Sequence, residues 1–162
     1  MDIATILLIG TTVLIICVLP FLIRHNKKKK KEKEIKEVIS RLAAKSNSGV
    51  DEYDWWNKTI IGIDNSNRKL FFIKKIHDKE LQSAIDLSNI QMGRVINSHR
   101  SVINGNYNVI QKLQLGLISK NKDKPETLLE FYNADYDSLT IMEELQLVEK
   151  WSKIVNSIVG KK

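Results

Sequence analysis

Cysteine is almost absent from this chain, which has one, Cys17, among 162 residues. A lone cysteine forms no internal disulfide, as is usual for proteins of a reducing compartment. The three histidines, His25, His77 and His99, lie far apart in the sequence, and no cysteine accompanies them at the spacing of metal ligands. These shortages argue against a metal centre.

Motifs of common catalytic sites are missing as well. The sequence has no glycine-rich loop for phosphates and no nucleophile elbow. Its acidic groups at residues 51–54 and 135–137 lack the loop spacing and closing glutamate of a calcium-binding hand, so we expect them in solvated turns. We therefore predict no cofactor, no bound metal and no enzymatic activity. The alternative, in which Asp64, Arg68 and His99 meet in space as a catalytic group, is not excluded by sequence.

Charge is missing altogether between Ile3 and Ile23, a run of 21 residues. As an α-helix the run would be about 31 Å long, which matches a hydrocarbon core of about 30 Å. A cleaved signal peptide is the alternative, but the only charge ahead of the run is Asp2, and residues 19–23 contain no small-residue cleavage pair. The sequence therefore predicts an uncleaved transmembrane anchor over residues 1–23.

A basic segment follows the uncharged run directly. Residues 24–37 contain eight Lys or Arg against three Glu. Positive side chains next to a membrane span stay on the cytoplasmic side. We therefore predict an integral, single-pass protein of the inner (cytoplasmic) membrane, with its N-terminus outside and residues 24–162 in the cytoplasm.

The excess positive charge is confined to this part of the chain. Residues 1–45 carry ten Lys or Arg against four Asp or Glu, whereas residues 46–162 carry sixteen against fifteen. A near-neutral domain argues against nucleic acid as a partner. Cations beside a membrane bind anionic lipid headgroups, with about 1 kcal/mol for each. The residues expected to do so, here called the basic collar, are Arg24, Lys27, Lys28, Lys29, Lys30, Lys31 and Lys33.

Residues 33–45 predict a helix, because they contain neither Gly nor Pro and carry one apolar stripe. The stripe follows the i, i+3, i+4, i+7 spacing: Ile35, Val38, Ile39 and Leu42. It is too short to sustain a coiled-coil stalk. Two alternatives remain, packing on the following domain or lying in the lipid interface. Residues 46–49 then form a hinge, which ends a linker over residues 24–49.

Residues 50–162 predict one domain with a modest core. Two β-rich runs, residues 58–63 and 69–74, flank an Asx-rich turn of about five residues and predict a hairpin. Further strand candidates follow at short intervals: residues 81–87, 90–96, 113–117 and 127–132. Turn signals at residues 104–106 and 120–125 separate them, so we expect an antiparallel meander.

The last predicted element is a helix. Residues 140–143, Thr-Ile-Met-Glu, fit a capping box, and Gly160 with two terminal lysines suits the C-terminus. Its apolar face is about five turns long and consists of Ile141, Leu145, Val148, Trp151, Val155 and Ile158. Trp151 lies at the centre of this face and is expected to fill the middle of the core. The predicted fold class is therefore α+β.

Two adjacent tryptophans, Trp55 and Trp56, open the domain. Neighbouring residues of a strand point to opposite faces, so one of the two is expected to turn into the core. The alternative is that the pair contacts the membrane interface or a partner protein.

The order of elements, a meander of five to seven strands and then a long helix with a buried Trp, resembles the pleckstrin-homology-like (PH-like) fold. The resemblance covers Val50–Val159 and rests on the hairpin Ile60–Ile73, the strand pair 113–117 and 128–132, and Trp151. It implies a bent antiparallel barrel that is capped by the C-terminal helix.

Two short stretches also look like small membrane-anchored bacterial proteins of undefined role: Ile61-Gly62-Ile63-Asp64 with Arg68-Lys69-Leu70, and Leu129-Glu130-Phe131-Tyr132-Asn133. Lipid-binding members of the PH-like fold concentrate Lys and Arg in the first hairpin loop. This chain has only Arg68 and Lys69 there, beside Asp64, which argues against specific phosphoinositide binding.

Taken together, the residues favour a non-enzymatic binding module that is tethered to a bacterial membrane and scaffolds a protein partner at its inner face. The alternative is a peripheral sensor of anionic lipid that uses the basic collar.

Overall fold

The computed structural model describes residue 2 and residues 29–101, 108–137, 141 and 143–160. The predicted span Ile3–Ile23, the collar residues Arg24, Lys27 and Lys28, and the turn signal at residues 104–106 lie outside the described residues. Within the described ranges, no helix has the length and apolar character needed to cross a membrane.

Sheet A contains the first four strands in chain order, each antiparallel to its neighbour: β1 (Glu52–Trp56), β2 (Thr59–Asp64), β3 (Lys69–Ile76) and β4 (Lys79–Asp86). The predicted hairpin is β2–β3, with a connection of residues 65–68. It is the second hairpin of the sheet. β1 was not among the predicted strand segments, although Tyr53, Trp55 and Trp56 are aromatic residues that favour strands. Trp56 does turn into the core, at 5% exposed, as expected for one of the two tryptophans.

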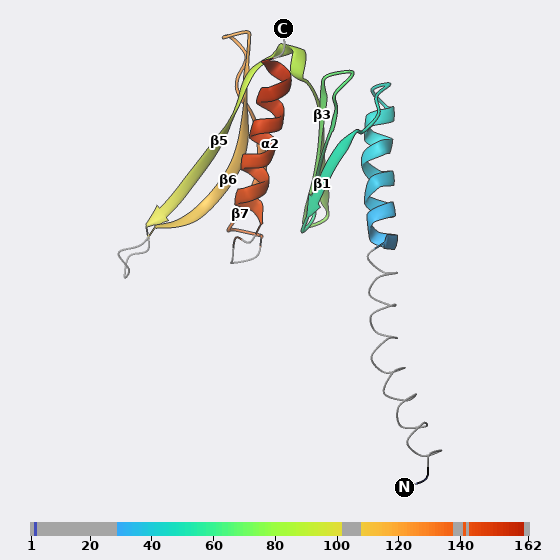
Figure 1. The fold of residues 1–162 in the computed structure, drawn as a ribbon. Helices are drawn as coiled ribbons and strands as arrows, with labels where there is room; N and C mark the ends of the chain where they lie inside the picture. Colours follow the sequence, from blue (N-terminus) through green and yellow to red (C-terminus); the bar gives the residue numbers. More distant parts are fainter. Residues whose placement is uncertain (1, 3–28, 102–107, 138–140, 142, 161–162) are drawn as a thin grey trace. The chain divides into compact units, whose positions relative to one another are not determined.

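Sheet B contains β5 (Ile90–Ser101), β6 (Asn108–Ser119) and β7 (Thr127–Asn133), in the order β5-β6-β7. A single 3₁₀ turn, η1 (Leu87–Asn89), leads into it from β4. β5 and β6 are 12 residues long, and β7 pairs with β6 only from Lys112 to Leu117, so the far half of the β5–β6 hairpin runs beyond β7 (Figure 1). All four later strand candidates are confirmed.

The strands form two separate sheets and not the closed barrel that a bent meander can produce. Strands of one sheet are not hydrogen-bonded to strands of the other in the described ranges. The chain leaves sheet A through η1, and the register of β5 shifts between Ile90 and Met92. A bulge at such a position bends the strand and changes its direction. Side chains from both sheets nevertheless share one core, which includes Leu70, Leu115 and Phe131.

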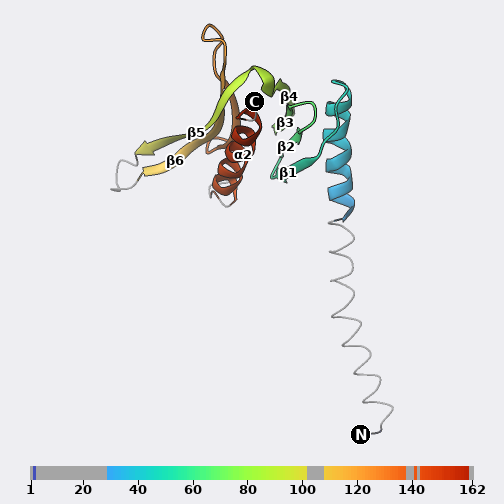
Figure 2. The same cartoon turned by 45° about the horizontal axis from the view of Figure 1, so that its top comes forward.

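The C-terminal helix α2 (Glu144–Val159) lies between the two sheets (Figures 1 and 2). Val148, Trp151 and Val155 are fully buried, and the Trp151 indole N–H donates to Asp54 Oδ2 on β1 at 2.8 Å. On the other side, the Gly93 amide of β5 donates to Asn156 Oδ1 at 2.8 Å, and Asn156 Nδ2 donates back to the Gly93 carbonyl. α2 therefore joins two sheets that share no ladder, and the expected central role of Trp151 in the core is confirmed.

The start of α2 differs from the prediction. The helix begins at Glu144, and its N-cap residue Glu143 makes no side-chain capping hydrogen bond, while Thr140 and Met142 lie outside the described residues. The predicted apolar face is correct from Val148 onward but wrong in the first turn. There Leu145 is 36% exposed, and Glu144 is buried because a hydrogen bond satisfies its carboxylate.

Residues 29–44 are helical, so the predicted linker helix is confirmed, and its last turns belong to the compact unit Ile39–Lys162. Ile39 and Ala43 are fully buried and Leu42 nearly so. A Cβ atom added to Gly62 of β2 would lie 2.6 Å from Ile39 Cδ1, so this turn packs on sheet A. Of the two alternatives for the apolar stripe, packing on the domain therefore holds for Ile39 and Leu42.

Candidate binding site at one end of the sheets

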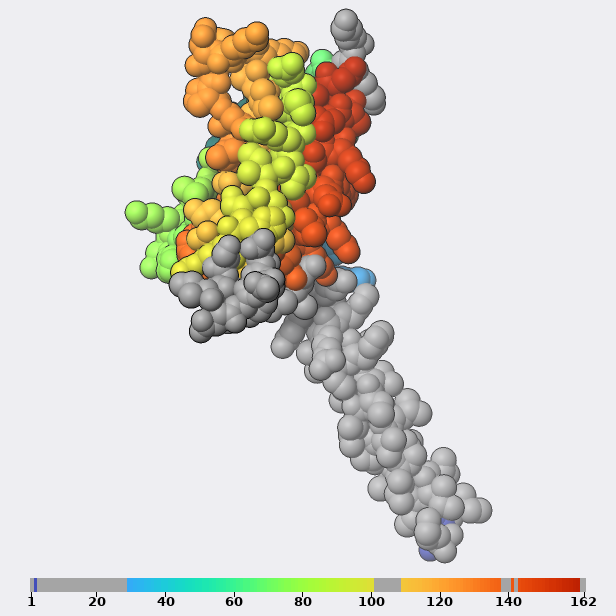
Figure 3. All heavy atoms as spheres, turned by 90° about the vertical axis from the view of Figure 1, so that its left-hand side faces the viewer, coloured from blue at the N-terminus to red at the C-terminus, as the bar shows by residue number. Residues whose placement is uncertain are grey.

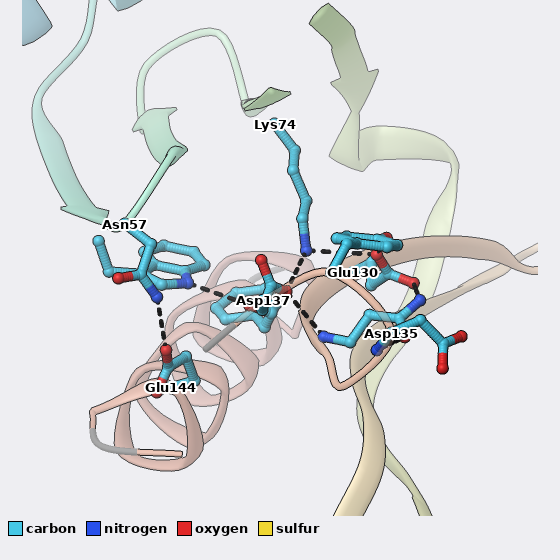
Figure 4. Close-up of polar contacts among 10 residues, drawn as sticks. Asn57, Lys74, Glu130, Asp135, Asp137 and Glu144 are labelled. Carbon is cyan, nitrogen blue, oxygen red and sulfur yellow. Dashed lines mark hydrogen bonds and ion pairs between the residues drawn. The ribbon is translucent and has the colours of Figure 1, made fainter. Parts of the chain in front are cut away.

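Lys74 on β3 is a lysine buried in the protein, with a side chain that is 2% exposed. Its Nζ atom lies 3.2 Å from Glu130 Oε1 on β7 and 3.0 Å from Asp137 Oδ2 in the loop after β7 (Figure 4). A buried charge is strongly unfavourable unless opposite charges and hydrogen bonds compensate it. Because β3 and β7 belong to different sheets, these ion pairs connect sheet A to sheet B.

Neighbouring groups complete the hydrogen bonding of both carboxylates. The Tyr136 hydroxyl donates to Glu130 Oε1, and the Tyr136 ring centroid lies 5.1 Å from Lys74 Nζ, within cation–π range. The backbone N–H of Asn133 donates to Asp137 Oδ2 at 2.8 Å, and its side-chain Nδ2 donates to Glu130 Oε2 at 3.0 Å. The cluster is therefore a satisfied polar network, in which each charged group has a fixed position.

Glu144 at the start of α2 adds a further buried carboxylate nearby. Asn57, in the turn between β1 and β2, donates to Glu144 Oε1 at 2.8 Å (Figure 4). Burial raises the pKa of the Tyr132 hydroxyl above its usual value, and the negative charges of Asp137 and Glu144 raise it further. Tyr132 therefore stays protonated at neutral pH.

An open pocket of about 330 Å³ lies over the cluster. Its walls come from the β1–β2 turn, the end of β3 and the loop after β7: Asn57, Lys58, Lys75, Ile76, His77, Tyr136 and Asp137. Lys58, Lys75 and His77 are exposed, whereas Asp137 is already paired with Lys74. Lys58 and Lys75 therefore give the rim excess positive charge, which can attract an anionic group.

The structure describes four of the seven predicted lipid contacts. Lys29, Lys30, Lys31 and Lys33 are exposed in the helical segment of residues 29–44. Arg24, Lys27 and Lys28 lie outside the described residues. The collar and the pocket are separate features of the chain, and the sequence predicted only the collar.

The basic residues of the β2–β3 turn are engaged within the protein. Arg68 Nη2 donates to the Ile158 carbonyl of α2 at 2.5 Å, and Lys69 Nζ donates to the Ser46 carbonyl at 2.6 Å. Asp64, the last residue of β2, is 4% exposed. Hydrogen bonds from the Asn67 backbone and side chain, and from the Gly49 amide, hold the pKa of Asp64 below its usual value.

The three residues of the alternative catalytic group come from different elements. Asp64 ends β2 and Arg68 precedes β3 in sheet A, whereas His99 lies on β5 of sheet B, opposite Ile110. Groups of three or more His, Cys, Asp or Glu able to hold a metal ion are absent from the described ranges. His25 lies outside these ranges.

The expected solvated turns hold for Asp51 and Asp135, which are exposed, but not for Asp54 and Asp137. Asp54 lies in strand β1, where it accepts from the Trp151 indole and from Lys150 Nζ, and Asp137 is paired with Lys74. Burial alone would lower the pKa of Lys150, but hydrogen bonds to Asp54 and Glu52 outweigh it, so the pKa is raised. These carboxylates therefore hold elements together.

Sequence reasoning missed Lys74, although a signal was present. Leu70 and Phe72 of β3 point into the core, and Lys74 follows at the same period of two. A lysine at an inward position of a strand requires buried carboxylates, and Glu130 and Asp137 supply them. No protein-family model, curated protein or solved structure matches this chain.

Proposed function

We propose that the chain is a single-pass, membrane-anchored, non-enzymatic binding module that displays a PH-like domain at the cytoplasmic face of a bacterial membrane and scaffolds a protein partner there. Anchoring is supported by the uncharged run Ile3–Ile23 and the cations that follow it. The PH-like domain type is supported by the order of elements, which is a four-stranded antiparallel sheet, a three-stranded antiparallel sheet and a helix with a buried Trp.

The observation that carries the binding role is the outer surface of sheet B. Met92, Val109 and Leu128 are large apolar side chains that are 42%, 41% and 49% exposed. These three lie on sheet B, and the other large apolar side chains that are exposed in the described residues, Leu81 and Leu145, lie on β4 and α2. Met92 and Leu128 lie near one end of the sheet and Val109 lies near the other. Several exposed apolar side chains on one sheet are typical of a surface that a partner covers.

The experiment is photocrosslinking of the full-length chain in its own membranes, with a photoreactive side chain at position 128. The proposal expects one reproducible protein adduct. A matched probe at Lys153, which is exposed on α2, is expected to give no adduct with the same protein. Recovery of no reproducible partner, or of the same proteins from both positions, would contradict the proposed scaffolding role.

The second candidate function is a sensor of anionic lipid. It is supported by the exposed collar residues, Lys29 to Lys31 and Lys33, and by the positive rim of the pocket at Lys58 and Lys75. Flotation of residues 29–162 with anionic vesicles compares two charge-removing variants. If only the collar variant Lys29→Gln/Lys30→Gln/Lys31→Gln loses binding, the collar makes the lipid contact. If only the pocket variant Lys58→Gln/Lys75→Gln loses binding, the pocket makes it. Unchanged binding in both variants would contradict a lipid sensor of either kind.

A further inference from the structure

The linker helix ends in a defined turn. The sequence predicts a hinge at residues 46–49, from the run Ser-Asn-Ser-Gly. In the structure the Ser48 amide donates to the Ala43 carbonyl at 3.1 Å, and the Asn47 amide donates to the Ala44 carbonyl at 3.0 Å. These two bonds form a Schellman motif, and Asn47 has the left-handed conformation that the motif requires, with a φ of 51°. The chain therefore leaves the helix in one direction.

Both ends of this segment are bonded to the connection between β2 and β3, residues 64–69, here called the β2–β3 corner. Lys69 Nζ donates to the Ser46 carbonyl at 2.6 Å, and the Gly49 amide donates to Asp64 Oδ2 at 2.8 Å. A hinge needs backbone groups that can reorient without losing hydrogen bonds. Rotation within residues 46–49 would instead break one or both of these bonds. All of these residues belong to the compact unit Ile39–Lys162.

The same corner also holds the C-terminus of α2. Arg68 Nη2 donates to the Ile158 carbonyl at 2.5 Å. Carbonyl groups in the last turn of a helix lack partners within the helix, and the helix dipole is negative there, so a guanidinium group stabilises this end. The Arg68 carbonyl in turn accepts from the Leu87 amide of η1 at 2.8 Å. The φ of Arg68 is 51°, which is uncommon for a residue other than glycine.

The β2–β3 corner therefore contacts three elements: the end of the linker, η1 and α2. From α2 the hydrogen bonding continues to sheet B, because Asn156 and Gly93 are doubly bonded. Figure 3 shows the last turns of α2 (red) beside the start of β5 (yellow-green). Contiguous hydrogen bonds and packed side chains of this kind can carry energetic coupling between distant elements.

We propose that the β2–β3 corner couples the end of the linker to the last turn of α2, so that loosening either one loosens the other. In this arrangement residues 46–49 are a fixed junction. A displacement of the linker end is passed through Asp64, Arg68 and Lys69 to α2, and from there to β5. The coupling involves no partner, so its test is independent of the scaffolding role.

The test is hydrogen exchange measured by mass spectrometry on the full-length chain in nanodiscs of neutral lipid. Gly49→Pro removes the N–H that bonds to Asp64. Gly49→Ala is its matched control, because it keeps the N–H and a Cβ atom there has no neighbour within 4 Å. Lys69→Met separately removes the bond to the Ser46 carbonyl.

Both Gly49→Pro and Lys69→Met are expected to accelerate exchange in residues 156–160 of α2 by about fivefold, the equivalent of one lost hydrogen bond. The first turn of α2, residues 144–148, is the internal reference and is expected to keep its rate. Gly49→Ala is expected to match wild type in both segments.

The reverse experiment uses Arg68→Met, which removes the bond to α2. Coupling between two sites is reciprocal, so this variant is expected to accelerate exchange at residues 46–49 by a similar factor. Acceleration confined to the element that each variant touches would overturn the proposal. Equal acceleration at residues 144–148 would also overturn it, because that pattern indicates a general loss of stability.

Discussion

The inner faces of both sheets are buried, whereas the outer face is buried in sheet A and largely exposed in sheet B. On β3 of sheet A, Phe71 and Ile73 are buried on the outer side as fully as Leu70 and Phe72 are on the inner side. On β6 of sheet B, the inner leucines are buried, and of the outer side only Gly116, which has no side chain, is buried in the described residues. The sequences reflect this difference, since Leu70-Phe71-Phe72-Ile73 is a continuous apolar run, whereas the β6 leucines alternate with polar residues and glycine. An uninterrupted run indicates a strand that is covered on both faces.

The largest expected effect tests what holds the two sheets together. Trp151→Ala removes the side chain that contacts the shared core and bonds to β1, and truncation of a buried Trp is unfavourable by about 3–5 kcal/mol. A domain of this size has roughly 5–15 kcal/mol in all. The variant of residues 29–162 is expected to unfold at a much lower temperature or to fail to fold. Lys153→Ala is the control, and a Trp151→Ala midpoint close to wild type would refute a core role for α2.

The next effect concerns the ionic link between the sheets. Lys74→Met leaves Glu130 and Asp137 without their cation, which destabilises a buried cluster by about 3–5 kcal/mol. Chemical denaturation is expected to show this loss and a partial recovery when Glu130→Gln and Asp137→Asn are added, because neutral groups are less unfavourable without the cation. Equal stability of Lys74→Met and wild type would show that the ion pairs contribute nothing net.

A matched pair of glycine variants compares the outer faces directly. Gly62→Ala on sheet A places a methyl group against buried Ile39, and overpacking of this kind destabilises by about 1–3 kcal/mol. Gly116→Ala on sheet B meets the ends of Glu126 and Ile96, which can swing into solvent, so a smaller change is expected. Equal midpoints, or a larger loss at Gly116, would show that the outer face of sheet A is not packed more tightly than that of sheet B.

The smallest effect is the pH dependence at Asp64, which accepts from the Gly49 amide and so joins sheet A to the predicted hinge after the linker helix. Its folded-state pKa is lowered, so its stabilisation is present above the unfolded value of about 3.9 and is lost as the pH falls through the folded value. Asp64→Asn is expected to be less stable than wild type by about 1 kcal/mol at pH 7. The difference should shrink below pH ~4, and a constant difference in urea melts across this range would contradict the assignment.

The fold was predictable in segments where the apolar residues follow one clear period, either that of a strand or that of a helix. The β2–β3 hairpin, β6 and the later turns of α2 have strong apolar patterns and were predicted correctly. β1 was missed because Glu52 and Asp54, which are unfavourable in strands, interrupt its aromatic residues and leave no apolar run. In the first turn of α2, Glu144 replaced Leu145 in the interior, because a hydrogen bond from Asn57, 87 residues away in sequence, satisfies its carboxylate.

The candidate site was less predictable than the fold. Lys74, Glu130 and Asp137 come from distant segments, and only the packing of sheet A on sheet B brings them together. The pocket above them likewise needs three turns at one end of the molecule. The basic collar, in contrast, is a run of neighbouring residues, so local sequence was enough to propose it.

The position of α2 in the chain has a consequence for how the protein is made. α2 follows both sheets in chain order, and its bond from Trp151 to Asp54 joins residues that are 97 apart in sequence. During synthesis the inner faces of both sheets therefore emerge before the helix that covers them. Long-range closure of this kind is slow, and partly made domains expose apolar surface. A pause in translation just before α2 should leave a nascent chain that depends on chaperones.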